Sequence, residues 1–292
     1  MGAMTDSHTS TNIEEAPEQS MASRGESRSR RPDSEAFREF MGSGWGPRIT
    51  KEVERCGAAD YLPERAAKAG APFAGERLVI PAGTYKVRNN DCNYRFRAHS
   101  AFAHLSGLGG EREPDSVLVL EPKENASHEA VLYFKPRTSR SAKEFYSDPH
   151  YGEFWVGARP CLEEVQLETG LKCAHIDTLP DALAKDVGRV KLRIVRGVDE
   201  SIEAMVNEVR EQAGLPFGEE ARSSDEAFEE RLSEIRLRKD PFELAELARA
   251  VEVTRAGFED ILRVLPRAVG HRRGERVVEG AFGAVAREEG NG

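Results

Sequence analysis

The chain has 292 residues, of which 39% are hydrophobic and 32% charged, and its formal net charge is −9. This length suffices for one large or two modest domains with a hydrophobic core. The acidic balance and the lack of a basic stripe with interleaved aromatic residues argue against nucleic-acid binding. No apolar run reaches the length of a membrane span, and the N-terminus lacks the apolar segment of a secretory signal. We therefore expect a soluble, cytoplasmic protein with no nucleic-acid or membrane partner.

The first segment, residues 1–34, is rich in Ser, Thr, Glu and Arg and nearly empty of large apolar side chains. Such a segment cannot bury enough surface to offset the entropy of ordering, so we expect a disordered tail. The pattern then becomes helical, with apolar residues at the i, i+3, i+4 spacing of one helix face: Phe37, Phe40 and Met41. Residues 42–47 interrupt this helix, and a second is expected over 58–69.

Three short apolar runs follow, at 78–80, 117–120 and 131–134, and each is stopped by a proline within two residues. Runs of this length bounded by turn residues predict strands. Because they are continuously apolar rather than alternating, both faces of these strands should be covered. This indicates a mixed α/β sheet.

The segment 190–195 has a different pattern, because apolar residues alternate with Lys191 and Arg193. Alternation predicts a strand with one face buried and one exposed to solvent. A helix over 202–209 and a polar loop over 214–224 are expected after it.

The strongest helix signal begins at Asp240. Asp240 is a good N-cap, Pro241 suits the first helical position, and Glu243 completes a capping box. Apolar residues then recur at helical spacing: Leu244, Leu247, Val251, Phe258, Ile261 and Leu265. We expect this long amphipathic helix to end at Pro266.

A last helix is expected over 275–289, with Gly290 as part of its stop signal. Its apolar residues would form a buried stripe: Val277, Val278, Ala281, Phe282 and Val285.

A catalytic constellation does not emerge from the sequence. The seven histidines include no H-E-x-x-H motif, and no G-x-S-x-G or Walker loop occurs. For His99 and His104 a packed or capping role is favoured over metal binding, and the glycine-rich residues 107–110 suit a turn better than a phosphate cradle. The adjacent acids Glu163 and Glu164 point apart on a helix, so solvated charges are favoured over an acid–base pair.

The four cysteines are Cys56, Cys92, Cys161 and Cys173, and none belongs to a C-x-x-C pair. Buried or half-buried free thiols in a reducing compartment are favoured over a metal or disulfide role.

Four stretches carry a family resemblance. They are residues 88–107, which include RNND and YRFRAHSAFAHLSG, 113–120 (EPDSVLVL), 153–159 (EFWVGAR) and 234–244 (EIRLRKDPFEL). In this order they resemble the Xaa-Pro aminopeptidases, metallopeptidases of the pita-bread family also called aminopeptidase P. The resemblance covers roughly residue 36 to the last residue, and it departs from the family over 141–151, which looks like an insertion.

The resemblance implies a fold and a domain organisation. The fold would be α/β, namely the creatinase/aminopeptidase P N-terminal domain with a mixed β-sheet flanked by helices. It would occupy residues 35–239 after the disordered tail 1–34, and residues 240–292 would be the first helices of an incomplete, truncated pita-bread domain. The N-terminal domain would also mediate a homo-oligomer, a dimer or a tetramer.

The resemblance also implies an activity. Family members remove the N-terminal residue from peptides with proline in second position, using two metal ions, usually Mn²⁺, held by Asp, Asp, His, Glu and Glu. In the family these ligands follow the two helices that start at Asp240, so no metal ligand is transferred to this sequence. Asp240 is interpreted as a cap, and Asp260 lies within the long helix. We expect this chain alone to be inactive.

One site carries over from the family. Trp155 matches the tryptophan that a neighbouring N-terminal domain offers to the rim of an active site, where its ring would contact a proline-containing peptide. Arg159 accompanies it. The alternative for Trp155 is local packing against its own domain, and the alternative for the whole chain is a non-catalytic module that binds peptides or proteins.

Overall fold

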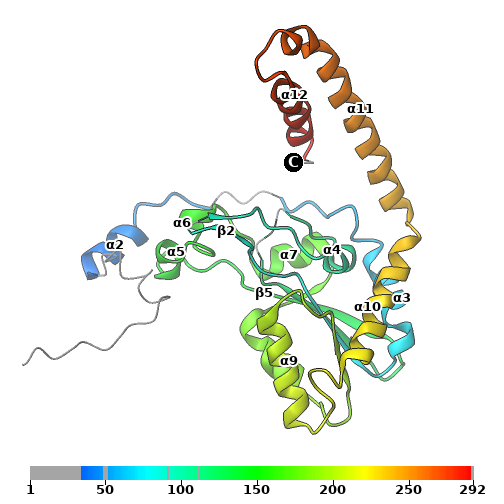
Figure 1. The fold of residues 1–292 in the computed structure, drawn as a ribbon. Helices are drawn as coiled ribbons and strands as arrows, with labels where there is room; N and C mark the ends of the chain where they lie inside the picture. The colour runs from blue at the N-terminus through cyan, green and yellow to red at the C-terminus, as the bar shows by residue number, and fades with distance from the viewer. Residues whose placement is uncertain (1–33, 49–51, 91, 111, 113, 291–292) are drawn as a thin grey trace, which may run out of the picture. The chain divides into compact units, whose positions relative to one another are not determined.

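The computed structural model describes residues 34–48, 52–90, 92–110, 112 and 114–290. The tail predicted to be disordered therefore lies, except for residue 34, outside the described residues. The chain divides into two compact units (Figure 1). The small unit comprises the segment up to Pro47 and Thr138–Trp155, and the large unit comprises Arg48–Arg137 and Val156–Gly292.

The small unit contains the helix α2 (Glu35–Gly42), the helix α5 (Glu144–Ser147) and most of α6 (Glu153–Val156). The first of these confirms the helix predicted from apolar spacing. It begins at Ser34, whose hydroxyl oxygen accepts a hydrogen bond from the backbone N–H of Phe37. This side-chain cap satisfies one of the backbone donors that the first turn leaves unpaired.

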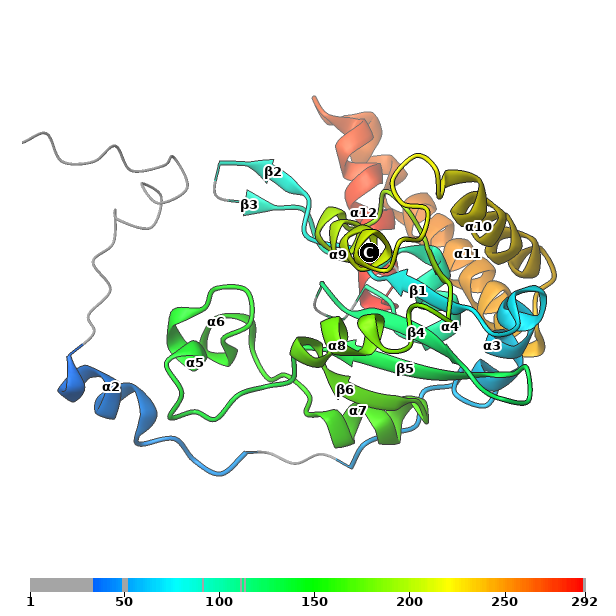
Figure 2. The same cartoon turned by 90° about the horizontal axis from the view of Figure 1, so that it is seen from below.

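The large unit is built on a five-stranded sheet in the order β6-β5-β4-β1-β7 (Figure 2). The strands are β1 (Arg77–Pro81), β4 (Val117–Pro122), β5 (His128–Phe134), β6 (Lys172–His175) and β7 (Leu192–Ile194). The three central strands pair antiparallel, whereas β6 and β7 pair parallel with their neighbours. The predicted mixed sheet is confirmed, and β4 and β5 extend beyond their apolar runs.

Both faces of the sheet are covered by helices. Alternate residues of β1 point to opposite sides, so that Leu78 and Ile80 join one core and Val79 joins the other. The first face packs on α3 (Leu62–Gly70), α4 (Ser100–Ser106), α7 (Leu162–Thr169) and α10 (Arg222–Leu237). The second face packs on α8 (Leu179–Ala184) and α9 (Glu200–Gln212). A separate hairpin joins β2 (Val87–Asn89) and β3 (Cys92–Asn93).

Several predicted boundaries differ from the structure. The helix expected over 58–69 begins only at Leu62, and the loop expected over 214–224 ends at Ala221, before α10 starts at Arg222. The strand expected to expose one face does not do so at Arg193. Its side chain is only 15% exposed, because it pairs with Glu76 and stacks 4.5 Å above the ring of Phe73.

The chain closes with two antiparallel helices, α11 (Pro241–Val269) and α12 (Gly274–Glu288). The prediction that Pro266 ends the first is wrong, since α11 continues through it for three further residues. Proline removes one helical hydrogen bond, but Ala268 is buried, so packing holds the last turn together. The α12 stripe predicted to be buried is only half-buried.

The buried ion pair between Arg210 and Asp225 gives a stability prediction. The Asp225 side chain is fully buried, and it accepts two hydrogen bonds from Arg210 and one from the backbone N–H of Ile194. We expect Asp225→Ala to lower the free energy of unfolding by about 3–5 kcal/mol, because it leaves a buried guanidinium unpaired. Urea denaturation measures the change.

The matched control for this prediction is Glu226→Ala, one position along the same helix. Glu226 is 57% exposed and pairs only at the surface with Arg222. Its loss should change the unfolding free energy by no more than about 0.5 kcal/mol. Equal effects of the two substitutions would contradict the assigned role of the buried pair.

Candidate functional site

Trp155, the residue predicted to reach a substrate, lies in α6 and is 58% exposed. Its indole N–H donates to the carbonyl of Tyr146 at 2.6 Å, and its ring lies edge-to-face against Phe154 with centroids 5.6 Å apart. The polar end of the side chain is thus anchored locally while much of the ring remains accessible. Both local packing and an outward role are compatible with this geometry, and the role at an active-site rim stays a prediction.

Arg159 is placed differently from Trp155. It belongs to the large unit and is 4% exposed, and its guanidinium donates to the carbonyl of Lys135. Its own carbonyl accepts from Arg137 at 3.0 Å. These contacts bind two loop segments to each other, and the participation of Arg159 in a substrate site also stays a prediction.

The described part of the chain contains no group of three or more His, Cys, Asp or Glu side chains arranged to hold a metal ion. Asp240 caps α11 as predicted, and Asp260 pairs with Arg263 at 3.1 Å. The described residues therefore do not fit a dinuclear metal centre, and no catalytic step is derived through one.

The two candidate histidines have packed roles, as predicted. His99 occupies the N-cap position of α4, and burial, with a smaller effect of Arg236, lowers its pKa. The Nδ1 atom of His104 lies 3.1 Å from a carboxylate oxygen of Glu243, and the side chain is 7% exposed. The glycine-rich turn is also confirmed, because Gly107 ends α4 with a φ of +73°.

His104 belongs to a polar cluster that attaches α11 to the sheet domain. Arg65 in α3 donates to Asp240 at 2.7 Å and to the carbonyl of His104 at 2.8 Å. The Arg65 and Asp240 side chains are only 7% and 16% exposed. Asp240 and Glu243 also form the predicted capping box. We call Arg65, His104, Asp240 and Glu243 the junction cluster, since it connects three helices that are distant in sequence.

The electrostatics of the junction cluster favour neutral His104 and ionised Asp240. Burial and the guanidinium of Arg65 lower the pKa of His104, and Glu243 opposes this shift only in part. Burial alone would raise the pKa of Asp240, but the backbone N–H of Glu243 and the side chain of Arg65 lower it overall. The cluster is therefore paired at neutral pH without a charge on His104.

The four cysteines and the adjacent acids Glu163 and Glu164 depart in part from what the sequence predicted. Burial raises the pKa of Cys173 to about 12, and Cys56 and Cys161 are half-buried, as predicted. Cys92 is exposed, however, because it lies in the β2–β3 hairpin outside the core. Glu164 is not simply solvated, since it pairs with Arg137 and caps α7.

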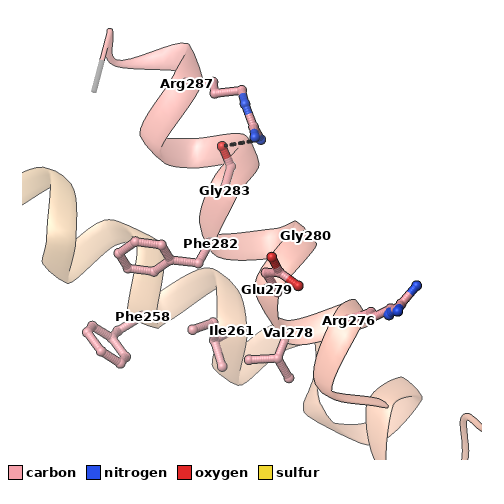
Figure 3. A pocket seen from close by; sticks show the side chains of 9 residues that line it. All are labelled: Phe258, Ile261, Arg276, Val278, Glu279, Gly280, Phe282, Gly283 and Arg287. Atoms are coloured by element: carbon pink, nitrogen blue, oxygen red, sulfur yellow. Dashed lines mark hydrogen bonds between the residues drawn. The ribbon is translucent and has the colours of Figure 1, made fainter. Parts of the chain in front are cut away.

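A groove lies between α11 and α12 (Figure 3). The rings of Phe258 and Phe282 meet edge-on with centroids 5.6 Å apart, and Arg287 donates to the carbonyl of Gly283 at 3.2 Å. Gly257 makes the close approach possible, because a Cβ atom at that position would lie 2.7 Å from the ring of Phe282. This groove is an open feature of helix packing and brings no catalytic group together.

One face of α11 also carries a row of exposed apolar side chains, which we call the α11 stripe. Its residues are all at least 39% exposed: Leu244, Leu247, Val251, Phe258, Leu262, Leu265 and Val269. Their spacing of three, four and seven residues places them on one narrow face beside the α12 contact.

The comparisons with known proteins agree with this architecture. Residues 63–195 match the family of the aminopeptidase P N-terminal domain. Two Xaa-Pro aminopeptidases of Streptomyces coelicolor, numbered 2 and 1, are 39% and 40% identical over 86% and 88% of this chain. The chain contains an aminopeptidase P N-terminal domain. It covers 50% and 49% of those two relatives, so it spans about half their length.

One solved structure shares the fold of this chain. Zinc-substituted aminopeptidase P from Escherichia coli in complex with product superposes with a TM-score of 0.59 and 21% identity. The match covers 80% of this chain and 50% of that one.

None of the helices in the described residues is long and apolar enough to cross a membrane.

Sequence reasoning missed most of the side-chain connections around this domain. Arg65 and Asp240 are 175 positions apart, and nothing local marks Arg65 as the partner of a helix cap. The cap itself carried a signal, because Asp followed by Glu three residues later is a capping box. The anchor of Trp155 carried none, since its indole N–H donates to the backbone carbonyl of Tyr146, nine positions earlier.

The junction cluster predicts a specific pH dependence. The pKa of His104 is lowered from 6.5 in the folded state, so below this pH the unfolded chain binds more protons than the folded chain. The contribution of neutral His104 to the free energy of unfolding is complete above pH 6.5, and it is lost as the pH falls toward the pKa of His104 in the folded state. His104→Gln, which keeps a polar partner for Glu243, should flatten this part of the profile.

Thermal or urea unfolding of both proteins as a function of pH measures the effect. His271→Gln serves as the control, because His271 is exposed between α11 and α12. An unchanged difference between the parent and His104→Gln across the acidic range would contradict the assignment.

The α11 stripe predicts that this chain self-associates. Soluble monomers rarely expose contiguous apolar patches above a few hundred Å², and a stable contact between two chains removes about 800 Å² from each. We expect Val251→Glu to shift the mass measured by light scattering toward that of the 32.3 kDa monomer. Ala245→Glu, exposed on the same helix outside the stripe, should leave association unchanged. A monomeric parent protein at every concentration would contradict this prediction.

Proposed function

We propose that this chain provides the N-terminal region of a Xaa-Pro aminopeptidase, which removes the N-terminal residue from peptides with proline in second position. The observation that supports this most strongly is the identity of 39–40% over at least 86% of the chain with two Xaa-Pro aminopeptidases. Such identity extends well beyond the matched domain, because 252 and 258 residues are aligned whereas the domain match covers residues 63–195.

We place the catalytic machinery in the part of those relatives that this chain does not cover. The described residues lack a cluster suited to a metal ion, and the chain spans only half of each relative. A pair of metal ions, with Mn²⁺ as the expected species, would polarise the scissile carbonyl and activate water when bound there. The residues of this chain would instead position the catalytic part through the junction cluster.

The finer assignments follow from this proposal. The boundary between N-terminal and catalytic regions lies at Asp240, where α11 begins. Trp155 offers its exposed ring to the substrate of a neighbouring subunit in a homo-oligomer, with Arg159 supporting the adjacent loop. The compartment is the cytoplasm.

The test combines gene sequence and activity. The DNA beyond codon 292 should encode the Asp, Asp, His, Glu and Glu ligands. The longer protein, supplied with Mn²⁺, should cleave a Xaa-Pro peptide, whereas the purified 292-residue chain should not. Turnover by the shorter chain would overturn the placement of the catalytic groups. A stop codon after residue 292 would favour the alternative, a module that binds peptides or proteins without hydrolysis.

Within the longer protein, Trp155→Ala tests the rim role. Loss of an apolar contact made equally in the ground and transition states should raise KM several-fold and leave kcat nearly unchanged. Phe40→Ala, which removes a 73% exposed aromatic ring from α2 of the same unit, is the matched control. Steady-state kinetics with an Ala-Pro peptide measure both variants, and an unchanged KM for Trp155→Ala would remove this residue from the substrate site.

A further inference from the structure

A pocket lies beside the turn between α11 and α12, distinct from the groove in Figure 3. Its volume is about 460 Å³, within the usual range of about 300–1,000 Å³ for small-molecule sites. Val264 and Arg267 line it from one face of α11, and Arg273 and Val277 line it from the start of α12. Arg276 borders both spaces, and its side chain is directed away from the two phenylalanine rings of the groove (Figure 3). We call this space the turn pocket.

Positive charge is concentrated at the turn pocket. Three exposed arginines line it together with the exposed His271: Arg267, Arg273 and Arg276. In the part of the chain that the structure describes, none of these arginines forms an ion pair with a carboxylate. The other arginines of α11 all do: Arg249, Arg255 and Arg263. Because the whole chain has a net charge of −9, this local excess of positive charge comes from the arrangement of the turn and not from composition.

The remaining polar groups of the turn pocket do not neutralise its arginines. Asp260 is the one carboxylate among the described residues that line the pocket, and it pairs with Arg263 at 3.1 Å. The Nδ1 atom of His271 accepts the backbone N–H of Arg273 at 3.0 Å, so the proton of the neutral ring lies on Nε2. The described residues therefore offer three guanidinium groups and one imidazole N–H to an acceptor from outside the chain.

The turn pocket also has an apolar wall. Val264, Val277 and Ala281 form it, and each is half-buried. Gly280 leaves the wall open, because a Cβ atom at that position would meet no neighbouring segment within 4 Å. A ligand that combines anionic groups with an apolar part fits these two kinds of surface, whereas an inorganic anion alone would leave the wall uncovered.

We propose that the turn pocket binds an organic diphosphate, with its phosphates on the arginines and its apolar part on the wall. Guanidinium groups form paired hydrogen bonds with phosphate oxygens. Two phosphate groups carry about three to four negative charges at pH 7, which is comparable with the charge of three arginines. The residues of the turn pocket belong to neither the α11 stripe nor the junction cluster, so the inference is independent of the proposed peptidase function.

Isothermal titration calorimetry of the full 292-residue chain tests the inference, with ADP as the probe and a chelator to remove divalent cations. We expect saturable binding of one ADP per chain. AMP should bind about tenfold more weakly, because one phosphate group forms fewer charged hydrogen bonds. Pyrophosphate should also bind more weakly than ADP, because it leaves the apolar wall uncovered.

Single substitutions separate the pocket from the general charge of the turn. Arg273→Gln should weaken ADP binding about tenfold, because it removes one charged partner of the phosphates. Arg272→Gln is the matched control, since Arg272 is the exposed neighbour in the same turn and does not line the pocket. At physiological salt, where charges are screened over about 8 Å, this control should change the affinity less than about twofold. Asp260→Asn should strengthen binding, because it removes the carboxylate that lines the pocket.

Gly280→Leu blocks the pocket without changing its charge. The added side chain enters open space, and leucine has a higher helix propensity than glycine, so the variant should fold. Circular dichroism checks its helix content. We expect ADP to bind this folded variant at least about tenfold more weakly than the parent chain.

Absence of ADP binding by the folded parent chain would overturn the inference, as would equal losses from Arg272→Gln and Arg273→Gln. Tighter binding of a short DNA duplex than of ADP would also overturn it, because the turn would then act as a general surface for polyanions. A longer protein that cleaves a Xaa-Pro peptide but ignores ADP would contradict only this inference, and the reverse result would contradict only the proposed function.

Discussion

Buried guanidinium groups are the constraint on which the packing of the large unit depends. A cation removed from water must be paired and hydrogen-bonded, or it destabilises the fold by several kcal/mol. Arg77 donates to Glu121 and to the carbonyls of Leu183 and Lys185, and Arg210 donates to Asp225 and to the carbonyl of Leu192. Arg77 of β1 thereby connects the sheet to α8, and Arg210 of α9 connects the start of β7 to α10.

The same rule places the C-terminal helices. Arg65 is paired with a carboxylate only when the cap of α11 approaches α3, because Asp240 supplies that carboxylate. The capping box thus has two roles, since it starts a helix and completes a buried ion pair. Because this ion pair fixes how α11 leaves the sheet domain, the junction cluster would give the domain a positioning role in the proposed aminopeptidase.

The sequence predicted the parts of this structure that depend on local pattern. Continuous apolar runs identified β1, β4 and β5, and the Asp240 capping box identified α11. It did not predict β6, whose four residues include no large aliphatic side chain, or α7, which is capped by the unusual residue Cys161. The helix α10 did carry a signal, with Phe228, Leu232 and Ile235 at i, i+4 and i+7, but its many charges obscured it. Pro266 was misjudged because packing on α12 outweighs a local preference.

The candidate site was less predictable than the fold for a physical reason. Trp155 was found by a motif, but the hydrogen bond that anchors its indole to the Tyr146 carbonyl depends on how α6 packs on α5, which no local pattern states. The α11 stripe consists mainly of aliphatic side chains in a regular helical row, so its positions could be predicted from the sequence. The exposure of these side chains could not, because it depends on which face of α11 packs against α12.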